Sequence, residues 1–161
     1  MFDGHFRTQI ERYVRPVGES LRRTGLSPDH FTVLGMLVAA GAAVAIGAGK
    51  MQLGLLLVIC SALPDLLDGA LAKASNSASQ RGAFFDSVVD RVSDSLLFGG
   101  VAWFYASSDS PRFGIVPFAI LGASLIISYE RAKAESLGLH AKGGLMERAE
   151  RIILLCVGLL F

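Results

Sequence analysis

The sequence is poor in the residues that mark disulfide-rich, nucleic-acid-binding or secreted proteins. It has only two cysteines, Cys60 and Cys156, and both lie in apolar stretches, which favours reduced thiols packed in helices over a disulfide or a metal site. Charged residues make up 18% of the sequence and the net charge is +1, so the charge gives no argument for nucleic acid as a partner. The first 30 residues are charged and lack a continuous apolar core, so we expect no cleavable signal peptide.

The composition instead indicates a membrane protein. Apolar residues make up 52% of the sequence and the mean hydropathy is +0.52, which is above the usual range of soluble domains. Five apolar segments follow one another along the chain: 32–49, 52–72, 83–106, 114–130 and 149–161. Because a helix needs about 20 apolar residues to cross a bilayer, the first four are predicted to span it and the fifth is too short. We therefore expect an all-α integral membrane protein with a single domain over residues 1–161, and a sequence truncated within its fifth transmembrane helix.

Residues 2–23 have the pattern of an amphipathic helix. Aromatic and aliphatic side chains recur every three or four positions from Phe2 to Leu21, with arginines between them. Such a helix suits the headgroup layer of a membrane, although a surface helix packed on a protein core has the same pattern. We expect residues 1–30 to form this interfacial helix and a turn, with Ser27 or Asp29 as a helix cap, and residues 31–161 to form the transmembrane bundle.

Basic residues indicate the orientation of the bundle. They gather before residue 30, around 73–81 and in 131–148, whereas the turns on the opposite side hold only Lys50 and Arg112. Because Lys and Arg favour cytoplasmic loops, the amino terminus and the basic connections are predicted to be cytoplasmic.

Aspartates inside two of the apolar segments mark a functional site, because ionisable groups are costly within a membrane. Asp65 and Asp68 are three residues apart on one predicted helix. The next helix carries a stripe at four-residue steps, which consists of Asp86, Asp90 and Asp94. The short connection 74–80 makes the two helices antiparallel and should bring both sets together near the cytoplasmic surface.

Four of these carboxylates would repel one another strongly if no cations lay between them, namely Asp65, Asp68, Asp86 and Asp90. The basic residues nearest in sequence are too few to neutralise them: Lys73, Arg81 and Arg91. One or two divalent cations would remove the repulsion, and hard oxygen ligands favour Mg²⁺ or Mn²⁺. Two alternatives remain open, namely pairing with arginines of other helices and the cation pathway of a transporter.

These residues belong to one continuous motif, Asp65-x2-Asp68-Gly69-x2-Ala72-Lys73-x8-Gly82-x3-Asp86-x3-Asp90. The motif resembles the signature of the CDP-alcohol phosphotransferases, D-x2-D-G-x2-A-R-x8-G-x3-D-x3-D. Every spacing agrees, and the one departure is Lys73 in place of arginine. LSPDHFTVLG (26–35) is similar to the first-helix segment of this family. The resemblance implies six transmembrane helices and a homodimer.

The resemblance also implies a reaction, in which a hydroxyl of a polar alcohol attacks the β-phosphate of CDP-diacylglycerol and CMP leaves. By this resemblance Asp90 is the general base, and two Mg²⁺ or Mn²⁺ ions are held by Asp65, Asp68, Asp86 and Asp90. The residues expected to bind CDP-diacylglycerol are Thr32, Asp68, Gly69, Lys73 and Gly82. Asp94 lies outside the signature, and we expect it to be hydrogen-bonded to a neighbour.

The acceptor alcohol is expected to contact the remaining basic residues, which are Arg131, Lys133, Arg148 and Arg151. Arginines bind phosphate in bidentate fashion, so such a cluster suits a phosphorylated acceptor, although membrane topology and anionic lipids also account for basic loops. Segment 128–152 is similar to actinobacterial phosphatidylinositol phosphate synthases, which favours inositol 1-phosphate as the acceptor. Glycerol 3-phosphate is the alternative acceptor, and a cation transporter or a non-enzymatic scaffold is the alternative class.

Overall fold

The computed structural model describes residues 27–74, 79–139 and 148–160, and in residues 65–74 it describes only the backbone. The elements, in chain order, are α2 (Pro28–Gly47), α3 (Met51–Ala74), α4 (Gln80–Ala106), the short 3₁₀-helix η1 (Pro111–Gly114), α5 (Ile115–Ser136) and α6 (Arg148–Leu160). No strand occurs in these residues, so an all-α fold is confirmed over the described part of the chain. The amphipathic helix predicted for 2–23 lies outside it.

Each predicted apolar segment corresponds to one of the long helices, with shifts at the ends. The prediction of a loop over 131–148 is wrong in its first part, because α5 continues to Ser136. Residues 130–136 are mostly polar, but they consist largely of Glu, Arg, Lys and Ala, which are strong helix formers. The helix therefore extends beyond its apolar stretch.

Local interactions explain where the helices begin and end. Ser27 precedes Pro28, which occupies the first turn of α2, and the Ser27 Oγ lies 2.6 Å from the His30 Nδ1. The hairpin to α3 passes through Gly49, whose φ of 76° favours glycine. The Ser79 Oγ accepts a hydrogen bond from the Gly82 N–H over 3.0 Å and thereby caps α4.

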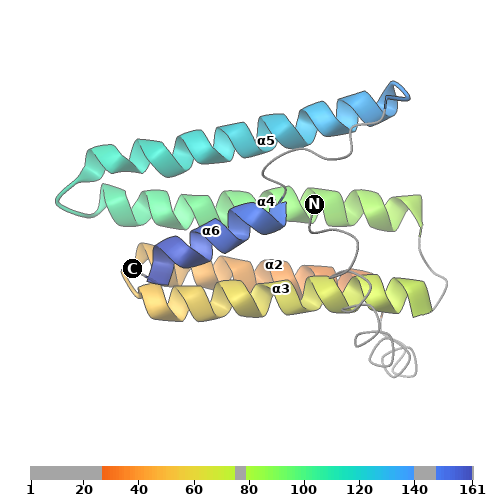
Figure 1. Ribbon diagram of the computed structural model, residues 1–161. Coiled ribbons are helices and arrows are strands. Elements are labelled where there is room, and N and C mark those ends of the chain that lie inside the picture. The colour runs from red at the N-terminus through yellow and green to blue at the C-terminus, as the bar shows by residue number, and fades with distance from the viewer. Residues whose placement is uncertain (1–26, 75–78, 140–147, 161) are drawn as a thin grey trace.

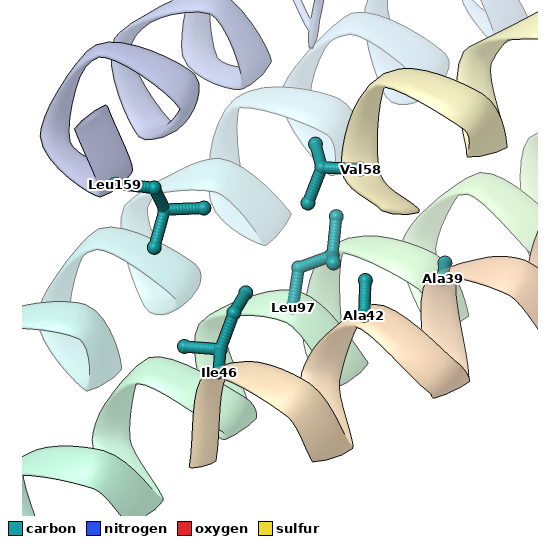
Figure 2. Close-up of a cluster of buried hydrophobic side chains, with 6 residues drawn as sticks. All are labelled: Ala39, Ala42, Ile46, Val58, Leu97 and Leu159. Carbon is teal, nitrogen blue, oxygen red and sulfur yellow. The ribbon is translucent and has the colours of Figure 1, made fainter. Parts of the chain in front are cut away.

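Helix α2 is central to the bundle, because it packs against both α3 and α4. Figure 1 shows α4 and α5 as one antiparallel pair, α2 and α3 as another, and α6 crossing between them. The core lies where α2, α3, α4 and α6 meet (Figure 2), and consists of Ala39, Ala42, Ile46, Val58, Leu97 and Leu159. This arrangement places the first residues of α2 and α4 and the last residues of α3 at the same end of the bundle (Figure 1).

Small residues allow the close approach of α2 to its neighbours. A Cβ added at Gly100 of α4 would lie 2.5 Å from the backbone oxygen of Ala43, and one at Gly35 of α2 would lie 3.4 Å from the Cβ of Pro64 in α3. The α2–α4 contact at Gly100 therefore has no room for any side chain.

Large apolar side chains cover the outside of the bundle. Leu37, Val44, Phe118 and Ile126 are all more than half exposed, which would be costly in water but suits a lipid environment. Within the described residues, Pro28–Gly47 and Pro111–Ser136 are long and apolar enough to cross a membrane. The further spanning segments predicted from the sequence remain predictions.

Candidate active site

The aspartates of α4 lie on one side of the helix and become more buried along it. Asp86 is half-buried, the side chain of Asp90 is 16% exposed, and that of Asp94 is 2% exposed. Four-residue steps in a helix stack side chains one turn apart, so the stripe leads from the start of α4 into the bundle.

Two arginines of α6 contact the inner part of this stripe. The Arg148 Nη1 lies 2.7 Å from the Asp90 Oδ1, and its Nε lies 3.4 Å from the Asp94 Oδ1. The Arg151 Nη2 lies 3.3 Å from the Asp94 Oδ2, and the side chain of Arg151 is only 6% exposed. The Asp90 Oδ2 also lies 3.4 Å from the Nη2 of Arg91. Asp90 and Asp94 are therefore held by charge-assisted contacts between helices that are distant in sequence.

These pairs correct one step of the sequence analysis. The cations counted there were only those near the aspartates in sequence, whereas Arg148 and Arg151 follow Asp94 by 54 and 57 residues. Of the four carboxylates in the motif, Asp90 is thus seen to pair with an arginine of another helix, Arg148. The expected hydrogen bond of Asp94 to a neighbour is confirmed, and its partners are these two arginines.

The predicted metal site is described only in part. Among the described side chains, no group of three or more His, Cys, Asp or Glu residues could hold a metal ion. The side chains of Asp65 and Asp68 lie outside this set. The end of α3 and the start of α4 lie at the same end of the bundle (Figure 1), so both helices carry their aspartates toward that end.

The donor chemistry of α4 fits a hard divalent cation. Asp86 and Asp90 supply carboxylate oxygens, the ligands that Mg²⁺ and Mn²⁺ prefer. Each oxygen of Asp90 has more than one lone pair, so contacts with Arg148 and Arg91 do not by themselves remove its capacity to bind a cation. The residues present are compatible with the implied metal.

The residues expected to bind nucleotide lie at the same end. Thr32 is buried in the first turns of α2, where its Oγ1 donates to the Pro28 oxygen over 3.3 Å. Gly82 lies in the first turn of α4, and the Arg81 Nη2 lies 3.8 Å from the Asp29 Oδ2, which joins the starts of the two helices. For Gly69 and Lys73 only the backbone of α3 is described.

The predicted acceptor residues are divided between two helices. Arg148 and Arg151 are on α6 beside the aspartates, whereas Arg131 and Lys133 are exposed on α5. The Arg131 Nε pairs with the Glu135 Oε1 over 3.3 Å, one turn along the same helix. Over the described residues α5 packs on α4 and η1 and has no close backbone contact with α6. The part of the predicted cluster that lies next to Asp90 is therefore the α6 pair.

Comparison with known proteins identifies the class. The family model for CDP-alcohol phosphatidyltransferase matches residues 26–160. The chain belongs to this family, so the family predicted from the sequence is confirmed.

Within the family, the chain is similar to phosphatidylinositol phosphate synthases. The synthase of Mycobacterium marinum is 38% identical over 154 residues, which cover 94% of this chain and 66% of that protein. The crystal structure of the Mycobacterium tuberculosis synthase with CDP-DAG bound has a TM-score of 0.84 at 36% identity, over 91% of this chain and 75% of that one. The same synthase in complex with manganese and citrate has a TM-score of 0.83 at 35% identity, over 90% of this chain and 70% of that one. The chain spans about two thirds of the length of the curated relatives that it matches, from 64% to 69% for three of them.

Proposed function

We propose that this protein transfers the phosphatidyl group of CDP-diacylglycerol to a hydroxyl of inositol 1-phosphate, which releases CMP and forms phosphatidylinositol phosphate. The observation that carries the proposal is the contact between Arg148 and Asp90, because a guanidinium suits a phosphate group and here lies beside the last aspartate of the signature. The names of the similar synthases favour this acceptor over glycerol 3-phosphate.

Asp90 takes the proton of the attacking hydroxyl in this proposal. The acceptor oxygen forms a bond to the β-phosphorus, the bond from that phosphorus to the oxygen of CMP breaks, and the proton moves to the carboxylate of Asp90. Such a base has to lie within hydrogen-bond reach of the hydroxyl. Arg148, which contacts Asp90 over 2.7 Å, can hold the phosphate of the acceptor near the same carboxylate.

Asp65, Asp68, Asp86 and Asp90 would hold two Mg²⁺ or Mn²⁺ ions. When bound, these ions neutralise the pyrophosphate of the donor and the charge that develops on CMP. The binding of manganese by the M. tuberculosis synthase supports a divalent metal in this family.

The nucleotide side of the proposed site comprises Thr32, Asp68, Gly69, Lys73 and Gly82. The two glycines let the donor approach the backbone closely. Lys73 supplies a compact point charge, whereas an arginine would supply a planar fork that binds phosphate with two nitrogens. We therefore expect Lys73 to neutralise a phosphate without fixing its orientation.

The acceptor phosphate is bound by Arg148 and Arg151 of α6. Arg131 and Lys133 of α5 complete the acceptor site in this proposal, and the pairing of Arg131 with Glu135 has to open for that contact. We further propose that the chain forms a single domain, that the protein crosses the cell membrane several times, and that it is a homodimer. Its amino terminus and active site lie at the cytoplasmic face in this proposal.

Release of CMP tests the proposal directly. Purified full-length protein is given Mg²⁺ or Mn²⁺, CDP-diacylglycerol and one acceptor at a time: inositol 1-phosphate, glycerol 3-phosphate, serine or free inositol. We expect CMP with inositol 1-phosphate and much less with the others. If CMP is released fastest with glycerol 3-phosphate, the alternative acceptor is established. If no CMP is released with any of the four acceptors, the proposed enzymatic activity is refuted.

A further inference from the structure

Asp94 has the most buried ionisable side chain among those described, with 2% exposed, and the proposed chemistry does not use it. It lies one turn beyond Asp90, outside the signature motif. Its two oxygens are divided between two partners, since Oδ1 accepts from the Arg148 Nε over 3.4 Å and Oδ2 accepts from the Arg151 Nη2 over 3.3 Å.

This division fixes the orientation of Arg148. A guanidinium is planar and rigid, so a contact at Nε determines the plane in which its other nitrogens lie. With the Arg148 Nε on Asp94, the Nη1 of the same group reaches Asp90 over 2.7 Å. Asp94 thus orients the group that contacts the proposed base.

Arg151 is held in the same way. Its side chain is almost fully buried, and Asp94 holds one of its terminal nitrogens. Arg148 and Arg151 are one turn apart on α6, so a single carboxylate of α4 fixes two cations of the facing helix.

We propose that Asp94 is a positioning residue that orients Arg148 and Arg151 for the phosphate of the acceptor. The proposal rests on the proposed function and adds to it a residue that selects a phosphorylated acceptor. It differs from a purely structural role, in which Asp94 would only tie α6 to α4 and would affect both substrates equally.

The test compares Asp94→Asn with Asp109→Asn in the full-length protein. Asparagine keeps the shape of aspartate but turns one acceptor oxygen into an N–H donor that faces a guanidinium. Asp109 is an exposed carboxylate between α4 and η1 and serves as the matched control. We expect the KM for inositol 1-phosphate to rise about 10- to 100-fold in Asp94→Asn, as when the support of a ligating residue is lost. The KM of Asp94→Asn for CDP-diacylglycerol should stay unchanged. Asp109→Asn should keep its KM values for both substrates.

Two further measurements separate positioning from folding. Calorimetric titration with inositol 1-phosphate, without CDP-diacylglycerol, should show the same loss of affinity and needs no turnover. The double variant Asp94→Asn with Arg151→Gln removes both buried charges, so it should fold even if the single variant does not. It should bind inositol 1-phosphate more weakly than Arg151→Gln alone, because Arg148 has then also lost its contact with Asp94, and equal affinities would refute the positioning of Arg148.

The outcomes distinguish the two proposals. If wild-type protein releases CMP and Asp94→Asn keeps its KM and affinity for inositol 1-phosphate, the positioning role is refuted and the function stands. Equal losses for both substrates would also refute it, in favour of a structural role. If wild-type protein releases no CMP and does not bind inositol 1-phosphate, both proposals fail.

Discussion

Replacement of Arg151 by methionine tests whether the buried ion pair with Asp94 holds α6 in place. At the observed 3.3 Å, and with an effective dielectric constant of about 20, the attraction between the two charges is about 5 kcal/mol. Removal of one partner from a buried pair costs about 3–5 kcal/mol, because the other charge stays buried without compensation. Arg148 still contacts Asp94 over 3.4 Å, so we expect the lower value, about 3 kcal/mol.

Thermal unfolding in detergent measures this loss. For a chain of this length, a loss of about 3 kcal/mol lowers the Tm by roughly 6–12 °C. Arg131→Met is the matched control, because its ion pair with Glu135 has the same distance of 3.3 Å but a side chain that is 48% exposed. A pair of that kind contributes about 0.3–0.5 kcal/mol, so the Tm of the control should change by no more than about 2 °C. Equal shifts for the two variants would refute the argument from burial.

Three further predictions concern the proposed base, the metal and the packing. Asp90→Asn should lower CMP release about 10²- to 10⁴-fold while CDP-diacylglycerol still binds, and normal turnover would exclude Asp90 as the base. Chelation with EDTA should abolish CMP release, and added Mg²⁺ or Mn²⁺ should restore it; activity that persists in EDTA would refute the metal requirement. Gly100→Ala should destabilise the protein by about 1–3 kcal/mol in thermal unfolding, since its Cβ would lie 2.5 Å from the backbone of Ala43. Gly99→Ala, where a Cβ meets nothing within 4 Å, should be neutral or stabilising. Equal changes in stability at both glycines would contradict the close contact between Gly100 and Ala43.

The positions of the long helices could be predicted from the sequence because apolar runs and turn residues are local signals. The segment predicted at 83–106 corresponds to α4 over Gln80–Ala106, and 149–161 corresponds to α6 over Arg148–Leu160. The end of α5 was less predictable, because hydropathy falls after residue 130 while helix propensity does not. Hydropathy therefore located the apolar part of each helix better than its polar ends.

The signature motif predicted which aspartates share a helix, because spacing of three or four residues determines a common face. It did not predict their partners. The contacts of Arg148 with Asp90 and of Arg151 with Asp94 depend on how α6 crosses the bundle, which no local pattern contains. The shortage of basic residues near the aspartates in sequence was a usable signal. It indicated that cations from elsewhere have to compensate the carboxylates, but not which ones.

The three aspartates of α4 have the same spacing and the same chemistry, yet the fold gives them different environments. Asp86 is half-buried near the start of the helix, Asp90 is less exposed and contacts Arg148, and Asp94 is enclosed with two arginines. Because a buried carboxylate is stable as an anion only when cations or hydrogen bonds compensate it, depth along α4 decides which aspartate needs protein partners most. The innermost one therefore contacts two guanidinium groups, whereas the outer two lie nearer the start of the helix and are more exposed. The contacts of α6 with α4 thus give the proposed base, Asp90, and the proposed positioning residue, Asp94, different partners.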